Sequence, residues 1–202
     1  TNRDANRGGC AQICRWTFDI ENEREPFSMT PKDLNMAKYI EDMINIGVNS
    51  FKIEGRMRSV YYIATIISEY RKIIDKIKMH NLKLNDILYS NDIMNRCANR
   101  ESAPQFYDKF PSDKEQYYLG RTEESNQDFL GIVLESSDNE ILLEQRNYFK
   151  IGDVVEFFGP NMEPFTYTIT KIYNENHENI DIARHPRMLT YLSGLPKMSK
   201  GS

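Results

Sequence analysis

The sequence predicts a mixed chain with an α/β first half and a β-rich second half. In roughly the first hundred residues, apolar positions at helical spacing alternate with short strand-like runs, and the connections between them are short. That alternation is typical of α/β structure. From Phe129 onward the chain consists of short apolar runs bounded by Gly, Pro, Asn and Asp, which favours a small all-β unit.

The bulk composition indicates a folded protein. The 202 residues suit one or two domains, and 40% hydrophobic with 28% charged residues is ordinary for a globular chain. The net charge of −4 argues against a basic protein that coats nucleic acid, so we expect no DNA partner. A local basic patch could still bind RNA. We expect no membrane association, because the longest apolar run, Val60–Ile67, is too short to span a bilayer.

The first residues and the cysteine content suggest part of a cytoplasmic protein. The chain starts at Thr1 with neither an initiator methionine nor a signal-peptide pattern, so we expect an excised fragment whose upstream part is missing. Three cysteines without a secretory segment favour a reducing compartment. A disulfide between Cys10 and Cys14 is the alternative.

The first expected elements are a strand and a helix. Residues 15–20 have strand-like composition. Thr30 suits a helix N-cap and Pro31 the first helical position, so the pattern predicts a helix that starts here. Apolar residues follow at helical spacing until Gly47, which can end the helix.

A second strand and two more helices are expected next. Residues 48–54 predict a short strand, and a long helix is expected from about Ser59. A shorter helical piece is expected at residues 92–97. The apolar stripe of the long helix comprises Ile63, Ile66, Ile67, Tyr70, Ile73, Ile74 and Ile77.

The β-rich half opens with a predicted hairpin. Residues 129–135 and 140–146 flank an Asp138-Asn139 turn. Strands at this spacing suggest a small barrel or sandwich. The remaining expected strands are 154–158, 165–172 and 180–183.

The segment Asn2–Trp16 carries two thiols four residues apart. Cys10 and Cys14 follow a Gly-Gly pair and lie among arginines. Glycine allows close backbone approach to a bulky group, and nearby arginines favour the thiolate, which is the form that binds metal. A C-x3-C pair alone does not complete a tetrahedral or cluster site, and two buried structural thiols are the alternative.

Three segments in this order resemble the central region of peptidase family U32, the collagenase-like family that includes RNA hydroxylation proteins. They are Asn2–Trp16, the string F-S-M-T-P-K-D-L at residues 27–34, and the string F-K-I-E-G-R-M-R-S-V-Y-Y at residues 51–62. The resemblance implies that residues 1–110 are the C-terminal part of a TIM-barrel-like catalytic domain. It further implies a linker at 111–128 and the family's β-barrel domain at 129–202.

The resemblance also implies a cofactor and an activity. Cys10 and Cys14 match the second pair of cysteines that hold a [4Fe–4S] cluster in hydroxylating members, whose first pair lies upstream. Cys97 is expected to be a core cysteine. The implied activity is 5-hydroxylation of the tRNA wobble uridine with prephenate as co-substrate. The implied partners are tRNA and a possible protein partner of the same family.

Four charged residues near the end of the expected strand at 48–54 are candidates for the active-site mouth. In a TIM barrel, side chains at the carboxyl ends of strands line the active site. Glu54 and Arg56 are the candidate catalytic residues, and Lys52 and Arg58 are candidate substrate ligands. Arginine binds carboxylate or phosphate oxygens bidentately. The alternative is a structural ion network between Glu54 and the arginines.

Arg7 and Arg15 are further candidate substrate ligands, because they could place positive charge near an anionic cluster or an RNA backbone. Hydrogen bonds that only stabilise the loop are the alternative for both.

Two other functions stay open. The first is a peptidase, as the family name says, although the sequence has no H-E-x-x-H, no G-x-S-x-G and only three histidines. The second is a non-catalytic β-module that binds RNA or a protein partner.

Overall fold

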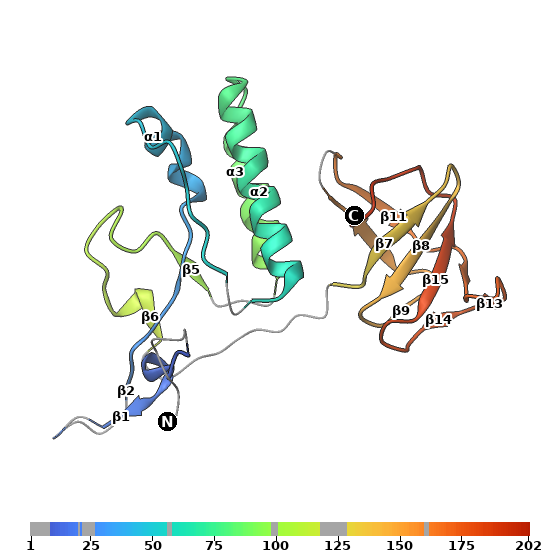
Figure 1. Cartoon of the computed structure of the whole chain (residues 1–202), viewed down its shortest axis with the longest axis horizontal. Coiled ribbons are helices and arrows are strands. Elements are labelled where there is room, and N and C mark those ends of the chain that lie inside the picture. The colour runs from blue at the N-terminus through green and yellow to red at the C-terminus, as the bar shows by residue number, and fades with distance from the viewer. Residues whose placement is uncertain are drawn as a thin grey trace. The chain divides into compact units, whose positions relative to one another are not determined.

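The computed structural model describes residues 9–19, 21, 27–55, 58–97, 101–117, 129–159 and 162–202 (Figure 1). The chain divides into two compact units. The first comprises Thr1–Ile53 and Ile73–Ser125, and the second comprises Glu54–Lys72 and Asn126–Ser202. Within the described ranges, no helix combines the length and the apolar character that crossing a membrane requires.

Among the described residues of the first unit, the strands form three small two-stranded ribbons. β1 (Thr17–Phe18) pairs with β2 (Phe27–Ser28), and β3 (Thr30–Pro31) pairs with β6 (Gln116–Tyr117), both antiparallel. β4 (Asp33–Leu34) pairs in parallel with β5 (Ser102–Ala103). Of the strand expected at residues 15–20, the structure describes residues 15–19. Thr17 and Phe18 are β structure, whereas Arg15 closes a short 3-10 helix, η2 (Ile13–Arg15).

The helix predicted to start at Thr30 begins later, so that prediction was wrong. Residues 27–34 are extended, and helical structure starts with the 3-10 turn η3 (Ala37–Tyr39) and continues as α1 (Ile40–Asn45). Distant partners hold the extended backbone. The Lys32 amide donates to the Glu115 carbonyl (3.0 Å), and the Asp33 amide donates to the Glu101 carbonyl (2.9 Å). Tertiary hydrogen bonds therefore override a local helix-start pattern.

The predicted end of this helix agrees with the structure, but the strand predicted after it does not form. Gly47 follows α1 with φ +95°, a left-handed conformation that glycine adopts without strain. Residues 48–54 have no regular secondary structure. A strand needs a hydrogen-bonded neighbour, and the described residues provide none for this segment.

The long helix is confirmed as α2 (Val60–Lys78). Its predicted apolar stripe is largely correct, since Ile66, Ile73 and Ile77 are all buried. Ile67 is the exception, because it is 49% exposed and lies off the buried face.

The third helix, α3 (Leu84–Asn95), is longer than the piece predicted at 92–97. Its start is held by Asp86 in the first turn, whose Oδ2 accepts the Lys83 amide at 2.8 Å. Lys76 of α2 donates to Oδ1 of the same carboxylate at 2.7 Å, which ties the two helices together. The full length of this helix was hard to predict from the sequence, because polar residues at 85, 86, 91 and 92 interrupt its apolar pattern.

Asp86 supports a pH-dependent prediction. The hydrogen bond from Lys76 lowers the pKa of the Asp86 carboxyl, against the opposing effect of burial. The stabilisation is therefore present above the carboxyl's ordinary pKa and is lost as the pH falls through the lowered value. We expect Asp86→Asn to reduce the free energy of unfolding by about 1 kcal/mol at neutral pH and by much less in acid. Urea unfolding at both pH values checks this.

Asp92→Asn is the control, since Asp92 is exposed and pairs with Arg96 along one helix. Equal effects of the two variants would contradict the prediction.

The second unit is built on a five-stranded antiparallel sheet in the order β13-β12-β15-β8-β7. The predicted hairpin is confirmed as β7 (Gly131–Ser136) and β8 (Glu140–Gln145). Two ribbons accompany the sheet: β10 (Val154–Phe157) with β11 (Phe165–Thr168), and β9 (Phe149–Lys150) with β14 (Ile182–Ala183). The remaining strands are β12 (Ile172–Tyr173), β13 (Asn179–Ile180) and β15 (Leu189–Ser193).

The sequence prediction omitted β15, which lies in the middle of this sheet between β12 and β8 (Figure 1). Its five residues alternate between partly buried and buried, as a strand with one covered face does. The strand pairings of the described residues do not close the sheet into the predicted barrel. The described residues of the second unit therefore form an open sheet with two ribbons.

The second unit has its own apolar core, in which Phe149 is the largest fully buried side chain. Side chains from the sheet and from both ribbons contribute to it. Its buried members are Val133, Ile141, Leu143, Phe149, Phe157, Ile169, Ile172, Ala183, Leu192 and Leu195.

Candidate functional site

The two cysteines of the sequence motif lie on one short turn of the first unit, which we call the cysteine turn (residues 9–16). Gln12 takes a left-handed conformation with φ 56°, and η2 follows it directly. The Arg15 amide donates to the Gln12 carbonyl at 2.9 Å, and the Trp16 amide donates to the Ile13 carbonyl at 3.0 Å. Both cysteine side chains are exposed as thiols, so an external group can reach them.

The sulfur of Cys10 already accepts a hydrogen bond from the backbone. The Gln12 amide donates to Sγ of Cys10 at 3.3 Å. Hydrogen bonds to ligand sulfurs tune the reduction potential of iron–sulfur clusters. A backbone donor beside Cys10 thus suits a sulfur that carries negative charge.

The far end of the cysteine turn is held by two buried hydroxyl groups. The carbonyl oxygen of Cys14 lies 2.8 Å from Oγ1 of Thr30 and 3.2 Å from Oγ of Ser28. Sequence reasoning missed both residues and assigned Thr30 to a helix cap. The available signal was the spacing of two small hydroxyl residues at i and i+2, which places both on one face of an extended segment.

The thiol pair fits part of a cluster site. Cysteine thiolates are the usual ligands of iron–sulfur clusters, and such a cluster takes four of them. Within the described ranges, no three or more His, Cys, Asp or Glu side chains form a group that could hold a metal ion. The described residues thus place two thiols of the kind that such clusters use on one turn, without a complete ligand set. Cys97 is buried, as expected of a core cysteine.

Of the two arginines predicted near the cysteines, Arg15 is described. It is the last residue of η2, and its guanidinium donates to Oε1 of Gln12 at 3.3 Å. The structure therefore brings Arg15 together with Cys10 and Cys14 on one turn. The contact with Gln12 matches the alternative interpretation, in which Arg15 stabilises the loop. Arg7 lies outside the described residues.

The candidates near residue 54 do not lie on a strand. Lys52 and Glu54 are exposed side chains in the irregular segment at 48–55. Arg58 is half-buried, and its guanidinium lies over the Tyr62 ring, 5.0 Å from the centroid. That cation–π contact occupies one face of Tyr62. Arg56 lies outside the described residues, so the catalytic roles predicted for Glu54 and Arg56 stay predictions.

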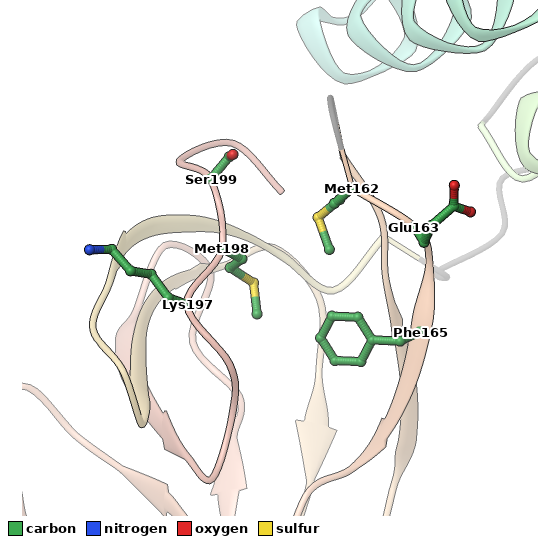
Figure 2. A pocket seen from close by; sticks show the side chains of 6 residues that line it. All are labelled: Met162, Glu163, Phe165, Lys197, Met198 and Ser199. Atoms are coloured by element: carbon green, nitrogen blue, oxygen red, sulfur yellow. The ribbon is translucent and has the colours of Figure 1, made fainter.

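The second unit has an open groove of about 440 Å³, lined by Met162, Glu163, Phe165, Lys197, Met198 and Ser199. Figure 2 shows the two thioether groups and the Phe165 ring directed into the same space, whereas the charged ends of Glu163 and Lys197 point away from it. Binding sites place a few polar groups so that they converge on the ligand. This groove has no such convergence, and the cysteine turn is the better candidate site.

Comparison with known proteins defines the class of protein. The model described as "Peptidase family U32" matches residues 1–117, and the model described as "Peptidase family U32 C-terminal domain" matches residues 125–202. The chain belongs to peptidase family U32, as its sequence motifs had suggested.

Individual relatives carry two kinds of names. The tRNA hydroxylation protein P1 of Bacillus subtilis (strain 168) is 41% identical, and the match covers 92% of this chain and 47% of that protein. A collagenase of Porphyromonas gingivalis is 42% identical over 37% of this chain and 22% of its own length. A solved C-terminal domain of a U32-family protein from Geobacillus thermoleovorans is 36% identical, with a TM-score of 0.36 over 37% of this chain and 94% of that domain. The chain spans about half the length of the B. subtilis relative.

Proposed function

We propose that the protein containing this chain is a cytoplasmic RNA-modifying enzyme that hydroxylates the wobble uridine of tRNA at carbon 5, with prephenate as co-substrate. The observation that carries the proposal is the 41% identity to a tRNA hydroxylation protein, which extends over 92% of the chain and so through both units. The identity to the collagenase covers 37% of the chain.

The cysteine turn is the part of this chain that we assign to cofactor binding. Cys10 and Cys14 would supply two of the four thiolates of a [4Fe–4S] cluster, and the Gln12 amide would donate to the first of them. When bound, the cluster would supply a redox or Lewis-acid centre. The chain itself contributes two exposed thiols four residues apart in the sequence and the backbone hydrogen bonds that hold the turn.

The charged candidates near residue 54 would form the part of the site that meets the anionic substrates. Prephenate is a dicarboxylate and RNA carries phosphates, and arginine and lysine bind both kinds of oxygen. Lys52 and Arg58 would bind these anions, and Glu54 with Arg56 would line the mouth of the site. The TIM-barrel-like architecture expected for residues 1–110 is part of this proposal.

The experiment is an analysis of tRNA nucleosides by mass spectrometry in a strain that lacks the gene. We expect the 5-hydroxyuridine-derived nucleoside to disappear and to return when the intact gene is restored. The purified intact protein, prepared without oxygen, should form 5-hydroxyuridine itself on unmodified tRNA only when prephenate is present. Unchanged tRNA in the deletion strain, together with loss of a peptide-cleaving activity, would overturn the proposal in favour of the peptidase.

A further inference from the structure

Ser28 and Thr30 lie beneath the cysteine turn and are almost completely buried, with 1% and 0% of their surface exposed. Strand pairing fixes both residues. Ser28 pairs with Thr17 across the β1–β2 ribbon, and Thr30 pairs with Tyr117 across the β3–β6 ribbon. The hydroxyls are therefore attached to backbone that the ribbons hold in place.

The distances among these groups indicate which hydroxyl donates a hydrogen bond to which acceptor. Two hydroxyl protons are available for three contacts: Ser28 Oγ to Thr30 Oγ1 at 2.8 Å, Thr30 Oγ1 to the Cys14 carbonyl at 2.8 Å, and Ser28 Oγ to that carbonyl at 3.2 Å. The Thr30 amide also donates to Ser28 Oγ, at 3.2 Å. The two shorter contacts are both satisfied when Ser28 donates to Thr30 and Thr30 donates to the carbonyl. Such a chain of donors strengthens each of its hydrogen bonds.

The cysteine turn depends on this chain because apolar burial does not hold it. No residue of η2 is buried, and both thiols are exposed. Segments with little buried apolar surface open at low free-energy cost unless hydrogen bonds restrain them. The restraint acts on the backbone carbonyl of Cys14, which is the residue that carries the second thiol.

We infer that Ser28 and Thr30 are positioning residues that hold the Cys14 end of the cysteine turn through its carbonyl group. Thr30 is the direct donor, and Ser28 orients the Thr30 hydroxyl. As far as it concerns a bound cluster, the inference rests on the proposed function. The restraint on the turn itself does not depend on that function.

The test compares four variants of the intact protein, with and without iron and sulfide. Thr30→Val keeps the shape and removes the donor, whereas Thr30→Ser keeps a hydroxyl. Ser28→Ala removes only the orienting group. Thr17→Val is the matched control, because it is the same change at an exposed position opposite Ser28. The readouts are hydrogen exchange at the Arg15 and Trp16 amides and the rate of iron release to a chelator.

In the iron-free protein, we expect Thr30→Val to speed exchange of these two amides roughly tenfold, because one buried hydrogen bond is lost. Ser28→Ala should have a smaller effect, and Thr30→Ser and Thr17→Val should stay near the wild type. In the loaded protein, iron release should accelerate in the same order. Exchange in Thr30→Val equal to that in Thr17→Val would overturn the inference.

The outcomes separate this inference from the proposed function. If the wild type holds no iron while Thr30→Val still speeds exchange, the proposed cofactor fails and the positioning role stands. If Thr30→Val also loses exchange protection in α3, the first unit has unfolded, and the comparison then rests on Ser28→Ala. In that case, faster exchange confined to the cysteine turn supports the inference, and exchange equal to the Thr17→Val control overturns it.

Discussion

Replacing Cys14 with serine in the intact protein is expected to remove bound iron and to reduce tRNA hydroxylation by more than roughly 100-fold. Loss of an outer-shell partner of a metal site commonly costs about 10- to 100-fold, and loss of a ligand should cost more. Serine keeps the size of the side chain but supplies no thiolate, which is the metal-binding form of cysteine. Iron content and the 5-hydroxyuridine yield, measured on the same anaerobic preparation, check this prediction.

Cys97→Ser is the matched control for that experiment. It is the same substitution at a buried cysteine, and it should cost stability while leaving iron content unchanged. Iron and activity retained in Cys14→Ser would contradict the assignment of Cys14 as a ligand. Loss of iron in Cys97→Ser with a folded protein would instead add Cys97 to the ligand set.

Replacing Phe149 with alanine is expected to destabilise the second unit by about 3–5 kcal/mol, the usual range for truncating a buried aromatic ring. Phe149 is 1% exposed and belongs to the core of that unit. Because a domain is stable by only about 5–15 kcal/mol, the variant should be close to unfolding at 37 °C. Urea unfolding, followed by the exchange protection of β8 and β15, measures the change.

The neighbouring residue provides the control. Tyr148 is 51% exposed, so Tyr148→Ala removes an aromatic ring of similar size without opening a cavity. It should change the free energy of unfolding by less than about 0.5 kcal/mol. Equal effects of the two variants would show that Phe149 is not a core residue.

The elements that the sequence predicts well are those formed by local interactions. The β7–β8 hairpin follows from two apolar runs around Asp138-Asn139, and α2 follows from one apolar stripe. Both depend on residues close together in the chain, where turn chemistry and periodicity are informative.

The prediction fails where distant residues decide the structure. The Thr30-Pro31 pattern favours a helix, yet residues 27–34 are extended because backbone groups near residues 101 and 115 bind them. β15 was missed although it pairs with β8, about fifty residues earlier. Such pairings depend on tertiary context that local propensity does not contain.

The same distinction applies to the candidate site. Cys10 and Cys14 could be found from the motif, because both thiols and the Gly-Gly pair lie within seven residues. Ser28 and Thr30 could not, since they contact the Cys14 carbonyl from 14 and 16 residues away. The functional roles of all the predicted site residues stay predictions: Cys10, Cys14, Arg7, Arg15, Lys52, Glu54, Arg56 and Arg58.

The most direct test of the account is the iron and acid-labile sulfide content of the intact protein purified without oxygen, together with its visible spectrum. The account predicts a brown protein with about four iron atoms per chain, as a [4Fe–4S] cluster requires. It also predicts that the colour disappears in a protein with serine substituted at both Cys10 and Cys14. A colourless, iron-free protein that still hydroxylates tRNA at the full rate would contradict it.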